Sequence, residues 1–145
     1  MTGWLIDTNV LSAFAPGKPA LAPELGTWFR ERGDALFLST ISAMEIETGI
    51  ARLRRTGARA KAAGLPAWFD RILQQYAERV LAFDLAAAHI ADTLNDAARA
   101  AGRHPGFADL AIAAIAQSRQ LTVLTVNLRH FRPLGVAALN PFATS

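Results

Sequence analysis

The chain has 145 residues, of which 52% are hydrophobic and 19% are charged, and this composition excludes intrinsic disorder, which requires low hydrophobicity and high net charge. It contains no cysteine, so disulfides, thiolate metal sites and thiol nucleophiles are excluded. The net charge of +3 and the pI near 10.2 are compatible with a nucleic-acid partner. The predominance of arginine over lysine equally fits a GC-rich genome.

The length predicts one domain that spans residues 1–145. The apolar runs are far shorter than the roughly 18 residues that a membrane span needs, so we expect no membrane association. Asp7 interrupts the first apolar stretch, and no basic segment precedes it, so a secretory signal is not expected either. These features favour a cytoplasmic protein.

The predicted elements alternate between short apolar strands and longer helices. The first half of the chain predicts a strand at 4–6, a helix at 24–32, a strand at 36–38, and helices at 42–55 and 66–78. The second half predicts a strand at 79–83, an alanine-rich helix at 85–101, a helix at 107–119, and strands at 121–125 and 136–139. This alternation is typical of the α/β class, and we expect a parallel sheet of four to five short strands flanked by helices.

Three acidic residues fall where such a fold places its functional site, outside the carboxyl ends of the strands. Asp7 ends the first strand, and Glu45 and Asp109 are each predicted in the first turn of a helix. Singly, each has a structural explanation, because a carboxylate complements the dipole at a helix start and can close a turn. Together they would raise one another's pKa unless a cation neutralised them, and oxygen-only ligands select Mg²⁺ or Mn²⁺. Asp84 is interpreted as a helix cap alone.

Four motifs, in order along essentially the whole chain, resemble those of PIN-domain proteins of the VapC/FitB type. They read LIDTNVL at 5–11, STISAMEIETG at 39–49, ADLAIAA at 108–114 and LTVNLRHF at 124–131. The resemblance implies a three-layer PIN-like fold and a bacterial ribonuclease toxin of a type II toxin–antitoxin system. It further implies Mg²⁺- or Mn²⁺-dependent cleavage of RNA, a small antitoxin partner and a homodimer.

The resemblance also implies roles for individual residues. Asp7, Glu45 and Asp109 match the metal-binding acids of the family. We expect Asp7 and Asp109 to be direct ligands, and Glu45 to bind directly, to bind through water or to act as a base. Asn9 and Thr125 would hold the carboxylates in place.

One departure concerns the fourth motif, where the family often has a further aspartate. The two corresponding positions here are Asn127 and His130, which we expect to lie beside the metal or the substrate. The cluster then carries three carboxylates, which favours a single divalent ion. The departure also supports an alternative function, a weakened PIN module that binds RNA or protein without cutting. For His130 itself, a surface turn histidine is the preferred interpretation over a general base.

A basic segment follows the second motif. It contains Arg52, Arg54, Arg55, Arg59 and Lys61. These residues are candidates for RNA phosphate contacts, and a solvated helix face or an antitoxin surface explains them equally well. The remaining aromatic and histidine residues have structural interpretations: Trp28, Trp68, Phe69 and Tyr76 as core or interface, and His104 as a loop surface residue with substrate contact as the alternative.

Overall fold

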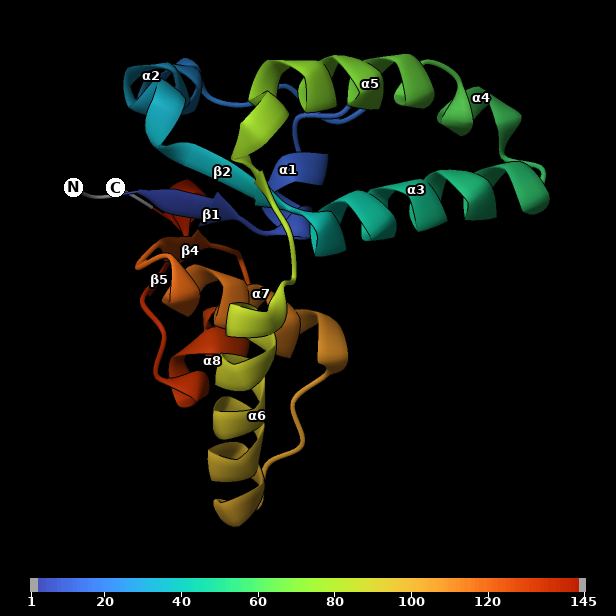
Figure 1. The fold of residues 1–145 in the computed structure, drawn as a ribbon. Helices are drawn as coiled ribbons and strands as arrows, with labels where there is room; N and C mark the ends of the chain where they lie inside the picture. The colour runs from blue at the N-terminus through green and yellow to red at the C-terminus, as the bar shows by residue number, and fades with distance from the viewer. Residues whose placement is uncertain (1–2, 144–145) are drawn as a thin grey trace.

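A computed structural model describes residues 3–143 as a parallel sheet with helices on both faces (Figure 1). The strands follow the order β3-β2-β1-β4-β5. The central strand β1 (Trp4–Ile6) pairs with β2 (Leu36–Ser39) and β4 (Thr122–Leu124), and the outer strands are β3 (Val80–Leu81) and β5 (Ala138–Leu139). The predicted fold class and parallel sheet are therefore confirmed.

The helices form two groups along the chain. The first group is α1 (Thr8–Ser12), α2 (Pro23–Arg32), α3 (Thr40–Arg55), α4 (Arg59–Ala62) and α5 (Leu65–Tyr76). The second is α6 (Leu85–Ala100), α7 (Phe107–Ser118) and α8 (Leu128–Phe131). Short 3₁₀ turns are η1 (Gly33–Ala35), η2 (Ala77–Arg79), η3 (Arg132–Leu134) and η4 (Pro141–Ala143). Figure 1 shows the first group above the sheet and the second below it.

Two predictions about helices are corrected by the structure. Helix α3 begins at Thr40, two residues earlier than predicted, because the Ser39 hydroxyl caps it and accepts a hydrogen bond from the Ser42 amide at 3.0 Å. Glu45 is consequently the sixth residue of α3 and lies in its second turn, not its first. The short helix α1 was not predicted at all, and it follows β1 directly.

The layer on the α6 and α7 side is built largely from small side chains. Residues 111–116 of α7 are at most 1% exposed, so this helix is buried on nearly all sides. Ala87, Ala91 and Ala98 of α6 are buried in the same cluster, where their small side chains let the two helices approach closely. This packing fixes the start of α7, which carries Asp109, against the sheet.

The opposite layer is aromatic. Trp68, Phe69 and Tyr76 of α5 are buried there, as predicted, and Trp28 is half-buried beneath the Arg32 guanidinium, 3.7 Å from its ring centre. No helix within residues 3–143 combines the length and apolar character needed to cross a bilayer.

Candidate active site

Asp7 lies at the centre of the site, where β1 gives way to α1. Its side chain is the N-cap of α1: Oδ1 accepts a hydrogen bond from the Thr8 amide at 2.8 Å. Its Oδ2 accepts another from the Thr125 hydroxyl, also at 2.8 Å, from the chain that follows β4. Because the residue is only 4% exposed, these two bonds hold the carboxylate in one orientation.

The surroundings of Asp7 change the pKa of its carboxyl. This pKa is raised from 3.8 to about 6, mainly by burial. The bonds from Thr125 and Thr8 oppose this rise, and the nearby charges of Asp109 and Glu45 add to it by a smaller amount. Asp109 and Glu45 are therefore close enough for their charges to act on Asp7.

Glu45 reaches the site from α3 and is held by a residue of α1. The Thr8 hydroxyl donates to Glu45 Oε1 and lies 2.9 Å from the Ser42 hydroxyl. Ser42 is fully buried and lies 3.4 Å from the Ser39 hydroxyl. A chain of hydroxyl groups thus connects the start of α3 to the start of α1 and orients Glu45.

Asp109 lies in the first turn of α7, as predicted. Its Oδ2 is 3.0 Å from Nδ1 of His130 on α8, a contact that becomes an ion pair when the imidazole is protonated. The His130 side chain is 42% exposed. His130 therefore lies at the surface, as predicted, but on a short helix instead of a turn, and it contacts one of the acids.

Asn9 and Thr125 join the two halves of the site. The Asn9 side chain accepts from the Val126 amide at 3.3 Å and lies 3.5 Å from the Thr125 hydroxyl. That hydroxyl also accepts from the Asn127 amide at 3.0 Å. Asn127 therefore contributes through its backbone, and its side chain makes no hydrogen bond to any residue among 3–143.

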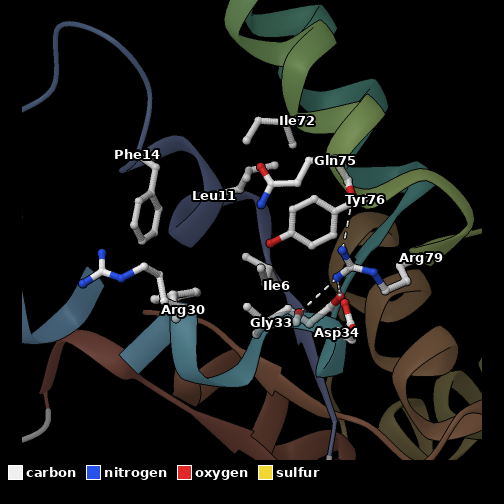
Figure 2. A pocket seen from close by; sticks show the side chains of 12 residues that line it. Ile6, Leu11, Phe14, Arg30, Gly33, Asp34, Ile72, Gln75, Tyr76 and Arg79 are labelled. Atoms are coloured by element: carbon white, nitrogen blue, oxygen red, sulfur yellow. Dashed lines mark hydrogen bonds between the residues drawn. The ribbon is translucent and has the colours of Figure 1, made fainter. Parts of the chain in front are cut away.

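Two cavities bear on where a ligand could bind, and they lie among different helices. One, of about 240 Å³, adjoins the site and is lined by Asp109, His130 and further basic residues. The other, of about 510 Å³, lies between α1, α2 and α5 and is mostly apolar (Figure 2). At its rim the Arg79 guanidinium donates to the Gly33 and Leu36 carbonyls at 3.1 and 2.6 Å. None of the predicted site residues lines this second cavity.

Comparison with known families decides the identity of the fold. A family model described as the PIN domain matches residues 4–134. The chain belongs to the PIN-domain family. This finding confirms the resemblance stated from the four motifs.

Relatives of this PIN domain carry names that bear on function. It is 34% identical over 140 residues to the plasmid stability protein StbB of Pseudomonas syringae, covering 95% of this chain and 97% of the relative. It is 31% identical to the toxin FitB of Neisseria gonorrhoeae, over 95% and 97% of the two chains. It is also 31% identical to the VapC ribonuclease Y4jK of Sinorhizobium fredii, over 95% and 96%.

Solved structures agree with this assignment. The FitAcB structure from Neisseria gonorrhoeae matches this PIN domain with a TM-score of 0.75 and 27% identity, over 97% of this chain and 99% of the other. VapBC-5 from Mycobacterium tuberculosis, described as a member of the VapBC family of toxin–antitoxin systems, matches with a TM-score of 0.61 and 25% identity, over 95% and 94%.

The structure does not bring every predicted residue of this PIN domain to the acids. The basic residues Arg52, Arg54 and Arg55 lie at the far end of α3, and Arg52 is roughly 10 Å further along the helix axis than Glu45. They are exposed, and Arg54 and Arg59 line a separate cavity of about 360 Å³. If these arginines contact RNA, they do so at a distance from Asp7, Glu45 and Asp109.

Sequence reasoning also missed residues that position the acids. Thr8, Ser39 and Ser42 were not singled out, although Thr8 follows Asp7 directly and Ser42 lies one helical turn before Glu45. A hydroxyl residue adjacent to a strand-end aspartate, or three residues before a glutamate on a helix, was the available signal.

The donor set suits a hard divalent cation. Carboxylate oxygens retain lone pairs after accepting one hydrogen bond, and a bound cation would offset both the burial of the Asp7 carboxylate and the charges of Asp109 and Glu45 beside it. Within residues 3–143, however, the side chains as they stand do not gather three or more acidic or histidine groups around one point. Glu45 and Asp109 instead engage Thr8 and His130.

Proposed function

We propose that this PIN domain is a divalent-metal-dependent endoribonuclease and the toxin of a type II toxin–antitoxin pair, acting in the bacterial cytoplasm. The observation that carries the proposal is that the charges of Asp109 and Glu45 act on the buried carboxylate of Asp7, which bonds from Thr8 and Thr125 hold in one orientation. Relatives named as a toxin and as a ribonuclease support it.

In this proposal each acid and its hydrogen-bond partner has a separate role in metal binding or catalysis. Asp7 and Asp109 would hold Mg²⁺ or Mn²⁺, and Glu45 would hold it directly or through water. When bound, such an ion polarises a phosphate oxygen and lowers the pKa of a bound water. Glu45, held by Thr8, would orient the attacking water or accept its proton, and Thr125 would keep Asp7 in its orientation.

A second candidate function rests on a specific contact. His130 occupies a position where the family often has an acid, and it engages Oδ2 of Asp109. If the imidazole stays bonded to that oxygen, Asp109 cannot use it to bind a metal ion. The domain would then bind RNA or a protein partner without cutting it.

Cleavage separates the two functions. We expect the purified protein to cleave single-stranded RNA with Mg²⁺ or Mn²⁺ and to stop when EDTA is added. Asp7→Asn should abolish this activity. Asp84→Asn is the matched control, because Asp84 also caps a helix after a strand but lies outside the cluster. Binding of RNA without cleavage in either metal would instead establish the second function.

A cognate antitoxin follows from the same proposal. We expect a small protein that covers the acids and places a basic side chain among them, replacing the cation electrostatically. Co-expression of the neighbouring small gene should rescue growth and yield a co-purifying complex. Growth arrest that no neighbouring gene relieves would contradict this assignment.

We also propose that the domain is a homodimer, since two-fold pairing is the commonest arrangement of soluble oligomers. Light scattering at high micromolar concentration should give twice the chain mass. A mass of one chain would contradict the dimer.

A further inference from the structure

The cavity of about 240 Å³ beside Asp109 has a basic lining. It lies between the loop that joins α6 to α7, the start of α7, and the α8–η3 segment. Its charged and titratable wall consists of Arg103, His104, Arg129, His130 and Asp109. The loop supplies the first two residues and α8 supplies the next two, so segments about 26 residues apart in sequence contribute to one basic wall.

The two arginines of this cavity are available for a ligand. No carboxylate among residues 3–143 forms a salt bridge with Arg103 or Arg129, and neither guanidinium donates a hydrogen bond to another described residue. Both side chains are exposed. The only acid in the lining, Asp109, already contacts His130. The cavity therefore presents two guanidinium groups that form no ion pair within residues 3–143, against the single carboxylate of Asp109 in its wall.

The start of α7 adds to this character. Gly106 is the N-cap of this twelve-residue helix and has no side chain to cap it. Gly106 also lines the cavity, so the positive end of the helix dipole adjoins it, which favours an anion. Planar guanidinium groups bind phosphate through two parallel hydrogen bonds.

The position of the cavity identifies the anion. Asp109 belongs both to the cavity wall and to the acid cluster, so a chain that passes the acids continues directly into the basic cavity. An RNA strand is repelled by the carboxylates and needs positive charge close beside them. The arginines of α3 are less suited to supply it, because they lie about two helical turns or further beyond Glu45.

We propose that this cavity binds the RNA phosphate adjacent to the one cleaved, with Arg103 and Arg129 as its phosphate-binding residues. The inference rests on the proposed ribonuclease function and extends it by a substrate subsite. It assigns RNA positioning to the loop and α8 and not to the basic end of α3.

Binding without metal tests the subsite independently of cleavage. In EDTA, anisotropy of a fluorescein-labelled oligouridylate should show Arg103→Gln and Arg129→Gln each weakening the Kd about tenfold. Each should also reduce the slope of log K against log salt by about 0.7, the value for one phosphate contact on a single strand. Arg119→Gln, an exposed arginine at the opposite end of α7 from Asp109, is the matched control and should leave both values close to wild type.

The substrate can be varied as well as the protein. With Mn²⁺ present, replacing the phosphate next to the cleaved bond by an uncharged methylphosphonate should lower kcat/KM of the wild type. The same replacement should have little further effect on Arg129→Gln, because the contact is already lost. Arg129→Lys should restore the salt slope but only part of the affinity, and thermal melting should show that all variants are folded.

The outcomes separate this inference from the function it rests on. RNA binding that depends on Arg103 and Arg129 without any metal-dependent cleavage would support the subsite and overturn the nuclease. Full RNA affinity in both variants, or an equal loss in Arg119→Gln, would overturn the subsite.

Discussion

Asp7 combines burial, two hydrogen bonds and the repulsion of two neighbouring acids in one side chain. Its folded-state pKa of about 6 exceeds the value of 3.8 that it has without these surroundings. The native state therefore binds this proton more tightly than the unfolded chain does. Below about pH 4 both states are protonated and the effect vanishes, whereas above about pH 6 both are ionised and the native state is destabilised.

Asp7→Asn should relieve this destabilisation. We expect the variant to gain on the order of 2–3 kcal/mol of unfolding free energy over wild type at pH 7.5, and much less at pH 4. Urea unfolding at both pH values measures the difference. Asp84→Asn, which removes a charge from an exposed cap, should show no comparable gain at the higher pH. Destabilisation of Asp7→Asn at pH 7.5 would mean that capping outweighs repulsion.

The missing fourth acid makes a prediction about metal stoichiometry. Three carboxylates and one divalent ion leave a charge of −1, and a second ion would bring the site to +1 without a phosphate to balance it. We therefore expect calorimetry to show one Mn²⁺ site in RNA-free protein. His130→Asp should tighten it, because this position contacts Asp109, and Asn127→Asp is the comparison. Two tight sites in the wild type would refute the one-ion arrangement.

At the scale of the element, the helix starts determine where the acids point. The sequence pattern predicted the long helices α3, α5, α6 and α7: the first three carry an apolar face at helical spacing, and α7 is apolar over most of its length. It did not predict α1, because a five-residue helix rich in Thr, Asn and Val has little intrinsic helix propensity. Its cap is Asp7 itself, so the same carboxylate that belongs to the cluster also starts this helix. The second-turn position of Glu45 was missed for a related reason, the cap at Ser39.

Ser39→Ala tests the role of that cap. The hydroxyl is fully buried, caps α3 and lies beside Ser42, so its loss should cost about 1–2 kcal/mol of unfolding free energy. Cleavage should also fall, because Glu45 is carried by this end of α3. The exposed Thr27, whose hydroxyl bonds within its own helix, provides the control Thr27→Ala, with a change below about 0.5 kcal/mol. Equal effects of the two substitutions would contradict a special role for Ser39.

For the molecule as a whole, the sheet order brings distant parts of the sequence together. The alternation of strands and helices was enough to predict the α/β class, and the motif resemblance predicted the PIN fold. Neither the alternation nor the motifs could predict the contacts within the site. The Asp7–Thr125 bond joins residues 118 positions apart and depends on the pairing of β1 with β4. The contact between His130 and Asp109 could not be predicted either, because Asp109 lies on a different helix 21 residues earlier.

Thr125→Val tests this long-range connection. The side chain is fully buried, and valine keeps its shape while leaving Asp7 Oδ2 and the Asn127 amide without a partner. We expect a loss of about 1–3 kcal/mol in unfolding free energy at pH 7.5. The loss should shrink near pH 4, because the bond lowers the pKa of Asp7 and its contribution disappears when that carboxyl is protonated in both states. A loss that is independent of pH would place the effect in packing alone.

The central position of β1 has a consequence for the time at which the site forms during synthesis. Asp7 leaves the ribosome's catalytic centre 118 residues before Thr125, a delay of roughly 6 to 24 s at about 5–20 residues per second. Until β4 is made, one edge of β1 has no neighbour and Asp7 lacks its hydrogen bond from Thr125. With the activity proposed above, we expect a nascent chain to complete its site only after β4 is made, and this delay leaves time for the proposed antitoxin to fold first.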